Sequence, residues 1–267
     1  MFQHNSGNSH FVFQRAARTR RLTGEQHYHG YFEIYLLDAG TCSYFIDDKV
    51  YQMKSGDLVL IPPGVLHKAN YTHEENARRL IWCSAQYVPQ DVIDRLPDMP
   101  HFYRNSAILS EITAILDRIE REGTREDGFT EHVLMHYMHL FFYTLLRGAA
   151  GCAQALSGNP YIEQAVLYIK AHYDRTLPLA EVAHHIAVSP EHLSRIFKKE
   201  TGFGFSEYLT ALRLQRAESM IKENPKRRIS AVAFACGFND SNYFSEKFKQ
   251  VYGYAPVQLR ARVKQEK

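Results

Sequence analysis

The sequence has few cysteines, one tryptophan and no long apolar run, and these shortages exclude several classes of protein. Its four cysteines, among 267 residues, are scattered without a C-x-x-C pair. Neither a disulfide-stapled scaffold nor a zinc ribbon is therefore predicted. The longest apolar stretch, Val133 to Leu146, is interrupted by His136 and His139 and is shorter than the roughly 20 residues that cross a bilayer. The polar start MFQHNSGNSH lacks the apolar core of a signal peptide, so we expect a cytoplasmic protein with no membrane segment.

Several catalytic fingerprints are also missing. The sequence contains no P-loop, no dinucleotide-binding fingerprint and no recognisable Ser or Cys hydrolase triad. Its composition is 45% hydrophobic and 23% charged, with 15 Gly and 10 Pro, and this balance excludes disordered, collagenous and low-complexity chains. We expect one large or two medium-sized globular domains.

Charge is distributed unevenly along the chain. Residues 1–158 contain 15 Lys and Arg against 18 Asp and Glu, whereas residues 159–267 contain 17 against 11. A basic module beside a mildly acidic one indicates a protein of which one half docks on a polyanion such as DNA. A lysine-rich solvated surface would give the same balance, so charge alone leaves both interpretations open.

The N-terminal half has the pattern of short antiparallel strands. Runs of aromatic and branched residues alternate there with turn-forming residues such as Asp, Gly and Pro. The four runs are Phe32–Leu37, Thr41–Ile46, Leu58–Ile61 and Arg79–Ser84. This pattern predicts a compact β barrel or jelly roll.

After about Ser106 the apolar period becomes helical. The apolar residues that share one helix face are Ile108, Ile112, Ile115, Leu116 and Ile119. A second helix is predicted from about Phe129 to Arg147. The two helices either form a subunit seam or cover one side of the barrel, and the sequence leaves both open. Residues 148–158 are small and uncharged and predict a linker, and the rest of the chain reads as helical.

An internal repeat occurs within the basic half. The pattern L-S-x-x-F-K-x-x-x-G, which begins at Leu193, recurs 51 residues later as F-S-x-x-F-K-x-x-x-G from Phe244. Ahead of each copy stands a small residue, Ala183 or Ala233, that lets two helices pack closely. The spacing predicts two helix-turn-helix units joined by a long helix over residues 205–222. A protein-binding array is the alternative, but arrays usually need more repeats to bury a core.

Two longer motifs surround the repeat. They read A-V-S-P-E-H-L-S-R-I-F-K-K-E-T-G and A-C-G-F-N-D-S-N-Y-F-S-E-K-F-K-Q-V-Y-G. Over about one hundred residues, from near Pro160 to Arg262, the chain resembles the DNA-binding domain of the AraC family of bacterial transcription regulators. The resemblance implies seven helices, two recognition helices that enter successive major grooves of promoter DNA, and action near RNA polymerase.

Recognition helices contact base edges through exposed side chains of their first turns. The predicted base-reading residues are Glu191, Ser194 and Arg195 in the first unit and Ser241, Asn242 and Glu246 in the second. Arg195 is the best candidate, because a guanidinium bonds O6 and N7 of one guanine. Glu246 departs from the basic residue that the family often carries, so the second unit reads weakly or chiefly positions the protein. The predicted phosphate contacts are Lys198, Lys199 and Lys249.

The N-terminal half contains a second group of chemistry-bearing residues. The patterns G-x-x-H-x-H-x-x-x-E from Gly24 and G-x5-P-x-G-x-x-H from Gly56 resemble the two motifs of cupin barrels, in which three His and one Glu converge on a divalent metal. These four ligand types are present as His27, His29, Glu33 and His67. The spacing after Gly24 is shorter than the cupin pattern.

The geometry of a strand indicates how these residues are placed. His27 and His29 alternate on a predicted strand and so face one side, while Glu33 and His67 are expected on neighbouring strands. Such imidazole and carboxylate groups suit Fe, Mn or Zn. We favour the other interpretation, a pocket that binds a small polar ligand through these groups and requires no cofactor. Aromatic rings that could stack on a sugar are Tyr31, Tyr44 and Trp82.

The sequence as a whole predicts an α+β multidomain protein. A cupin-like ligand-sensing barrel over residues 1–105 is followed by a helical dimerisation segment over 106–147, the linker over 148–158 and an all-α double helix-turn-helix domain over 159–267. We expect a ligand-responsive, sequence-specific transcription regulator, an activator of carbohydrate-related genes and not an enzyme. Its expected partners are double-stranded promoter DNA, RNA polymerase, a small-molecule inducer such as a sugar, and a second copy of the chain. The alternative is a metal-dependent cupin enzyme, an isomerase or dioxygenase, fused to a DNA-binding domain.

Overall fold

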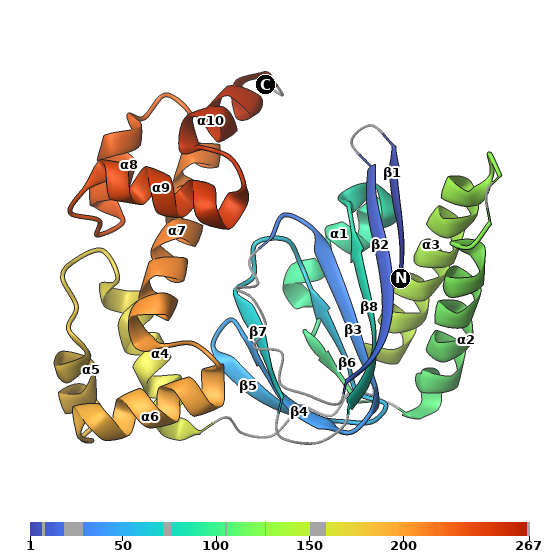
Figure 1. Ribbon diagram of the computed structural model, residues 1–267, viewed down its shortest axis with the longest axis horizontal. Coiled ribbons are helices and arrows are strands. Elements are labelled where there is room, and N and C mark those ends of the chain that lie inside the picture. The colour runs from blue at the N-terminus through green and yellow to red at the C-terminus, as the bar shows by residue number, and fades with distance from the viewer. Residues whose placement is uncertain are drawn as a thin grey trace.

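The chain folds into a β-rich N-terminal part and an all-helical C-terminal part (Figure 1). The computed structural model describes residues 1–6, 9–18, 29–71, 76–104, 106–125, 127–149 and 159–265. Within these ranges no helix combines the length and the apolar character needed to cross a membrane. The predicted fold class, α+β with a β-rich N-terminal part and an all-α C-terminal part, is confirmed.

The larger sheet has six antiparallel strands in the order β1-β2-β8-β3-β6-β9. They are β1 (Phe2–Ser6), β2 (Ser9–Arg18), β3 (Phe32–Ala39), β6 (Leu58–Ile61), β8 (Asn76–Cys83) and β9 (Phe102–Tyr103). Because side chains alternate along a strand, β3 divides between two faces. Ile34 and Leu36 belong to the core beneath the helices, and Tyr35 and Leu37 to the core between the sheets. The sheet is therefore buried on both sides.

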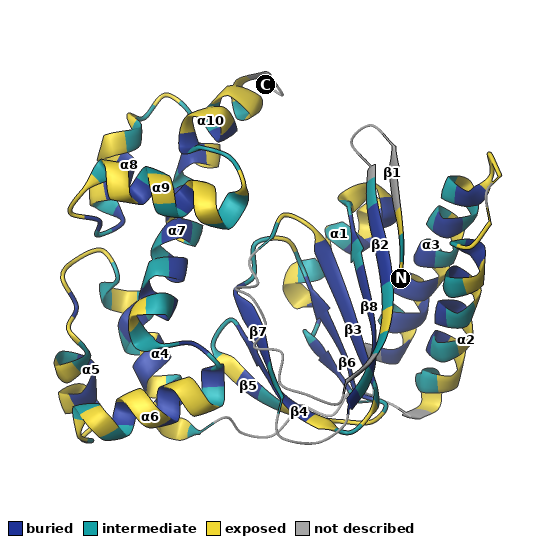
Figure 2. Ribbon diagram, in the orientation of Figure 1, coloured by how far each residue is buried: buried dark blue, intermediate teal, exposed yellow. Residues whose placement is uncertain are grey.

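The smaller sheet has three strands in the order β5-β4-β7. They are β4 (Thr41–Ile46), β5 (Lys49–Lys54) and β7 (His67–Tyr71). Every residue of β4 after Thr41 is buried (Figure 2). Tyr44 and Ile46 pack in the core between the sheets, whereas Phe45 packs among C-terminal helices. Among the described residues the strand ladders connect strands within each sheet, so the expected barrel takes the form of two facing sheets.

Two long helices, α2 (Ser106–Glu122) and α3 (Thr130–Ala149), cover the outer face of the large sheet (Figure 1). A short helix, α1 (Gln90–Ile93), lies between β8 and β9 in the chain. The predicted apolar face of α2 is confirmed, since Ile112, Ile115 and Ile119 are all buried. The linker predicted over residues 148–158 falls mostly outside the described residues, and α3 continues through Ala149.

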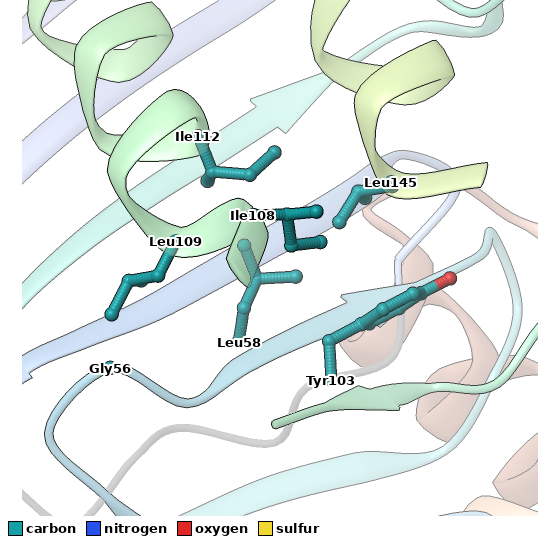
Figure 3. A pocket seen from close by; sticks show the side chains of 7 residues that line it. All are labelled: Gly56, Leu58, Tyr103, Ile108, Leu109, Ile112 and Leu145. Atoms are coloured by element: carbon teal, nitrogen blue, oxygen red, sulfur yellow. The ribbon is translucent and has the colours of Figure 1, made fainter. Parts of the chain in front are cut away.

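A small cavity lies where α2 and α3 meet the sheet (Figure 3). Its volume is about 10 Å³, room for about one water molecule. Its lining is largely apolar and consists of Gly56, Leu58, Tyr103, Ile108, Leu109, Ile112 and Leu145. A cavity of this size and lining is an imperfection of helix packing and not a ligand site.

The C-terminal part contains the seven helices that the resemblance implied. They are α4 (Pro160–His172), α5 (Leu179–His185), α6 (Pro190–Thr201), α7 (Phe205–Glu223), α8 (Ile229–Ala235), α9 (Ser241–Tyr252) and α10 (Pro256–Gln265). The helices α5 and α6 form the first helix-turn-helix unit, and α8 and α9 form the second. The long helix α7 joins them, since its first half packs in the core of the first unit and its second half in that of the second.

Both units use the same local chemistry at their turns. The small residues Ala183 and Ala233 are fully buried at the helix contacts, as predicted. The chain then turns through the left-handed region at Ala187 (φ 57°) and Gly237 (φ 79°). The recognition helices start at side-chain caps, because Ser189 and Asp240 each accept a first-turn backbone N–H.

Candidate ligand pocket and DNA interface

Four side chains converge on the Glu33 carboxylate between the two sheets. The Tyr44 hydroxyl donates to Oε1 at 2.5 Å, and the Trp82 indole N–H donates to Oε2 at 2.6 Å. Nε2 of His29 lies 3.0 Å and Nε2 of His67 lies 3.4 Å from the same Oε2. Glu33 is only 3% exposed, so these contacts replace its hydration. We call these five residues the Glu33 cluster.

The cluster is assembled from both sheets. Glu33 on β3 is the register partner of Trp82 on β8, and Tyr44 and His67 reach them from β4 and β7 of the facing sheet. The expectation that Glu33 and His67 come from neighbouring strands is therefore wrong. The reason is pairing, because β3 pairs with β6 and β8 while β7 pairs with β4.

The residues just before β3 differ from the expectation. His29 is not part of a strand and reaches Glu33 from the segment that precedes β3, while His27 lies outside the described residues. The Tyr31 ring is 38% exposed and stacks on His10, with 4.2 Å between ring centroids. The same ring lies beside His29 of the Glu33 cluster, with 6.3 Å between ring centroids, so Tyr31 borders the cluster from its more exposed side.

Backbone carbonyls determine which ring nitrogen of each histidine faces the carboxylate. Nδ1 of His29 lies 3.0 Å from the carbonyl of Tyr31, and Nδ1 of His67 lies 2.7 Å from that of Val65. A carbonyl oxygen only accepts, so each Nδ1 carries a proton and each Nε2 faces the carboxylate. Burial by itself raises the pKa of Glu33, but the charges and hydrogen bonds of His67 and His29 outweigh it and hold this pKa well below its usual range. The carboxyl group is therefore ionised.

A further polar side chain, absent from the sequence prediction, faces the same interior. Arg78 on β8 is 8% exposed and donates to the Tyr71 hydroxyl. Its guanidinium also lies 5.8 Å from the ring centroid of Tyr35. Burial raises the pKa of Tyr35, so that hydroxyl stays protonated. The available signal was the strand period, which puts Arg78 on the same face as Leu80 and Trp82.

The recognition helix α6 presents its predicted DNA contacts to solvent. The exposed residues are Glu191, Ser194, Arg195, Lys198 and Lys199. The opposite face is buried through Leu193, Ile196 and Phe197, as predicted. Nη2 of Arg195 lies 3.2 Å from Nδ1 of His192, so the guanidinium is held near the start of the helix. The exposed residues run along the length of α6. Two of them, Lys198 and Lys199, lie beyond the first turns that carry the predicted base-reading residues.

The second recognition helix, α9, is arranged similarly. Asn242, Glu246 and Lys249 are exposed and Ser241 is half-buried. Tyr243, absent from the sequence prediction, is also exposed, and Nζ of Lys247 lies 5.7 Å from its ring centroid. The sequence did carry a signal for this exposed residue. Tyr243 lies in the first turn of the helix, and its position does not follow the spacing of the core residues.

Family models match both halves of the chain. Residues 9–138 match the AraC-like ligand binding domain, and residues 182–262 match a helix-turn-helix domain. The HTH-type transcriptional activator RhaS of Klebsiella pneumoniae (strain 342) is 25% identical over 249 residues, covering 88% of this chain and 87% of that protein. RhaS of Salmonella typhimurium is 24% identical over 247 residues with the same coverage.

Solved structures of related proteins also match. The C-terminal domain of AraT, a response regulator from Geobacillus stearothermophilus, is 33% identical and covers 39% of this chain and 86% of that one, with a TM-score of 0.37. ToxT from Vibrio cholerae O395 is 14% identical and covers 95% of this chain and 98% of that one, with a TM-score of 0.40.

Proposed function

The chain belongs to the AraC family of DNA-binding transcription regulators, and on this premise we propose that its regulating ligand binds at the Glu33 cluster. The observation that carries this proposal is a buried, ionised carboxylate surrounded by polar and aromatic side chains inside the matched ligand-binding domain. Burying a charge is costly, and ligand sites place a few polar groups in otherwise apolar surroundings. The RhaS relatives are transcription activators, and we propose no enzymatic activity for the chain.

We propose a carbohydrate as the ligand and carbohydrate-related genes as the targets. The Glu33 carboxylate is a strong acceptor for sugar hydroxyls. The rings of Tyr44 and Trp82 offer flat apolar faces, and Arg78 adds donors within the same interior.

We also propose that the protein acts as a homodimer through α2 and α3 and contacts RNA polymerase at the promoter. The support for dimerisation is the solvent-facing side of α3, where Leu140 is 44% exposed and Tyr143 is exposed beside it along the helix. Exposed apolar groups of this kind mark association surfaces. Sedimentation of the Leu140→Asp variant tests this dimer interface. A variant that forms as much dimer as the wild type would contradict the proposal that α3 lies in the interface.

The regulator proposal is tested by genome-wide binding and transcript measurement in the native host. We expect binding near promoters and a response of the adjacent genes to one added carbohydrate. Glu33→Gln should abolish or fix that response while promoter binding persists. The control is Asp98→Asn, an exposed carboxylate in the same half of the chain, which should respond normally. A folded Glu33→Gln protein with normal induction would contradict the assignment of the pocket.

A divalent cation is our second candidate for the same cluster. His29, Glu33 and His67 each offer one ligand atom, and these atoms lie within 4.8 Å of one another. Two ligand atoms about 2.1 Å from a shared ion stand about 3.0–3.4 Å apart in octahedral or tetrahedral geometry. The two Nε2–Oε2 separations are 3.0 and 3.4 Å. Carbonyls that hold the other ring nitrogens are typical partners of metal-bound histidines, so the residues fit a cation.

Metal content of the purified full-length protein tests this candidate. We expect about one Zn, Mn or Fe per chain, lost in His29→Ala and retained in His184→Ala, an exposed histidine on α5. A chelator should lower the melting temperature of the wild type only if the ion is bound. Suppose that the purified protein contains no metal and that added metal does not change its melting temperature. Cation binding at the cluster would then be rejected, and the metal-dependent enzyme alternative with it. The ligand proposal would stand.

A further inference from the structure

The outer face of the three-stranded sheet packs on the first helix-turn-helix unit. Phe45, Val50 and Leu66 share one buried cluster with residues of α4, α6 and α7. The Phe45 ring meets Phe203 and Tyr208 edge to face, with centroids 6.0 and 5.7 Å apart. Edge-to-face pairs contribute beyond the area they bury. The two halves of the chain therefore share a continuous apolar core.

Two ion pairs flank this core. Nζ of Lys68 lies 3.1 Å from Oε1 of Glu207, and Nζ of Lys170 lies 2.8 Å from Oδ1 of Asp47. Nζ of Lys68 also stands 4.5 Å from the ring centroid of Phe203. The Lys68 side chain is 9% exposed, so solvent screens its pair less than it screens a surface pair.

Two side-chain amides connect β7 and the segment before it to α6 and α7. Asn70 on β7 donates to the carbonyl of Lys199 at 2.5 Å, in the last turn of α6. Gln215 on α7 donates to the carbonyl of Gly64 at 2.6 Å. The base-reading residues of α6 stay exposed. The sheet thus contacts the recognition helix without covering the side that carries its predicted base-reading residues.

Residues of the Glu33 cluster adjoin these contacts along the strands. Tyr44 directly precedes Phe45 on β4, and His67 directly precedes Lys68 on β7. Because side chains alternate across a strand, the first of each pair points to Glu33 and the second to the DNA-binding half. Each of these two cluster residues is therefore bonded through the backbone to a residue at the interface.

The segment before β7 provides a third connection. The N–H of Gly64 donates to the carbonyl of His29 at 3.0 Å, while the carbonyl of Gly64 accepts from Gln215. Three members of the cluster are thus each one residue or one hydrogen bond away from a contact with α6 or α7.

We propose that the β5-β4-β7 sheet relays the state of the Glu33 cluster to α6 and α7, with Lys68 as the positioning residue. Its partner Glu207 also lies 3.7 Å from Lys198, a predicted phosphate contact, and accepts the N–H of Gly204 at the start of α7. When the Lys68–Glu207 ion pair breaks, Glu207 pairs with Lys198 alone, and Lys198 is then less available to contact a DNA phosphate. The inference rests on the proposed function in taking the Glu33 cluster as the ligand site.

Amide hydrogen exchange on the full-length chain tests the relay without DNA or ligand. Tyr44→Phe removes one hydroxyl from the cluster. We expect faster exchange over residues 198–215 and no change over 229–252, in the second unit. In a Lys68→Met background the same substitution should add nothing. In a Lys49→Met background, which alters an exposed lysine on β5, it should add its full effect.

Two results would overturn the relay. One is unchanged exchange over residues 198–215 in both Tyr44→Phe and Glu33→Gln. The other is a full response to Tyr44→Phe in the Lys68→Met background.

DNA affinity gives a second readout on the same full-length proteins, with a fragment selected by the wild type. Lys68→Met should weaken binding about fivefold, while Lys49→Met should leave it unchanged. Equal affinities would contradict the role of Lys68. A wild-type chain that selects no fragment would count against the proposed function, and the exchange data would still decide the relay.

Discussion

The buried charge of Glu33 is stabilised by four neighbouring side chains, so substitution of any one of them removes only part of that stabilisation. Oε1 receives one hydroxyl, and Oε2 faces three ring nitrogens. Losing a donor to a buried charged group costs about 1.5–3 kcal/mol. Tyr44→Phe leaves the three ring nitrogens around Oε2 in place, whereas loss of a histidine leaves the hydroxyl on Oε1 in place.

At the recognition helix, two neighbouring cations should behave differently. Arg195→Ala is expected to weaken a specific DNA site by about 1–3 kcal/mol and to relax one base position, because a guanidinium reads a guanine edge. Lys198→Ala should weaken all sequences alike and reduce the salt dependence. Binding-site selection with each variant measures both effects. An unchanged consensus for Arg195→Ala would refute its assignment as a base reader.

A carboxylate of the first unit should make stability depend on pH. Hydrogen bonds from Arg175 and then Tyr168 lower the pKa of Glu181 to about 2. Its unfolded value is about 4.3, so its contribution is complete above about pH 5 and is lost as the pH falls toward 2. Urea unfolding should show wild type more stable than Glu181→Gln at pH 7, with a smaller difference at pH 3. A difference that is equal at both pH values would contradict this.

The resemblance to the two cupin motifs was enough to single out His29, Glu33 and His67, which lie together in the structure. The spacing could not show that two facing sheets bring them together, since pairing partners are set by contacts far apart in the chain. Arg78 was missed for another reason. A charged residue within a strand normally faces solvent, and only the cover of the second sheet buries this one.

Among the elements, the two glycines that flank α9 in the second helix-turn-helix unit are under different constraints although their backbones match. Gly237 and Gly253 both have positive φ, 79° and 77°. A Cβ on Gly237 would stand 2.5 Å from the carbonyl oxygen of Tyr173, whereas one on Gly253 would meet nothing within 4 Å. A side chain at Gly237 is therefore disfavoured both by the positive φ and by the lack of space, whereas at Gly253 only the positive φ disfavours it.

These two glycines make a matched pair of variants. Gly253→Ala should lower the free energy of unfolding by about 1–2 kcal/mol, the strain of a left-handed residue with a Cβ. Gly237→Ala should lower it further, because the backbone at Tyr173 must also move. Urea unfolding of the two variants measures the difference, and equal losses would show that the close approach is relieved without strain.

The sequence predicted the elements whose residues are uniform in character. The buried strands β3, β4 and β6 are rich in branched and aromatic residues, and the recognition helices have clear caps. Strand β7, His67–Tyr71, was not among the runs predicted as strands, although His67 itself was expected on a strand, because the segment mixes His, Lys, Ala and Asn. Its polar residues Lys68 and Asn70 contact the other half of the chain, so the usual contrast of apolar core and polar solvent face does not apply there.

At the scale of the molecule the chain is a series of layers. Helices α2 and α3, the large sheet, the small sheet and the first helix-turn-helix unit follow one another (Figure 1), and α7 extends the series to the second unit. No pattern in the sequence predicted the contact between sheet and helices, because Tyr44 and Phe45 look alike as apolar strand residues. Only the fold assigns them to different cores.

This layering predicts how the protein unfolds. We expect full-length protein to melt in one cooperative step, and Phe45→Ala to split it into two, because a buried Phe→Ala change removes about 3–5 kcal/mol from the contact between the halves. Phe141→Ala, which lies within the helix and sheet layer, should lower the melting temperature without splitting the transition. Scanning calorimetry measures both. One transition in Phe45→Ala would show that the halves are joined elsewhere.

The alternation along β4 and β7 also bears on how this regulator can evolve or be engineered. Neighbouring codons specify a residue of the Glu33 cluster, the proposed ligand site, and a residue that contacts the helical C-terminal half. Mutations confined to inward codons such as those of Tyr44 and His67 can change specificity without rewriting Phe45 or Lys68. A library randomised at the inward codons alone would keep the side chains of the interface and, if the proposed relay operates, would yield variants whose resting state at α6 and α7 also differs, so candidate biosensors need screening for both specificity and basal output.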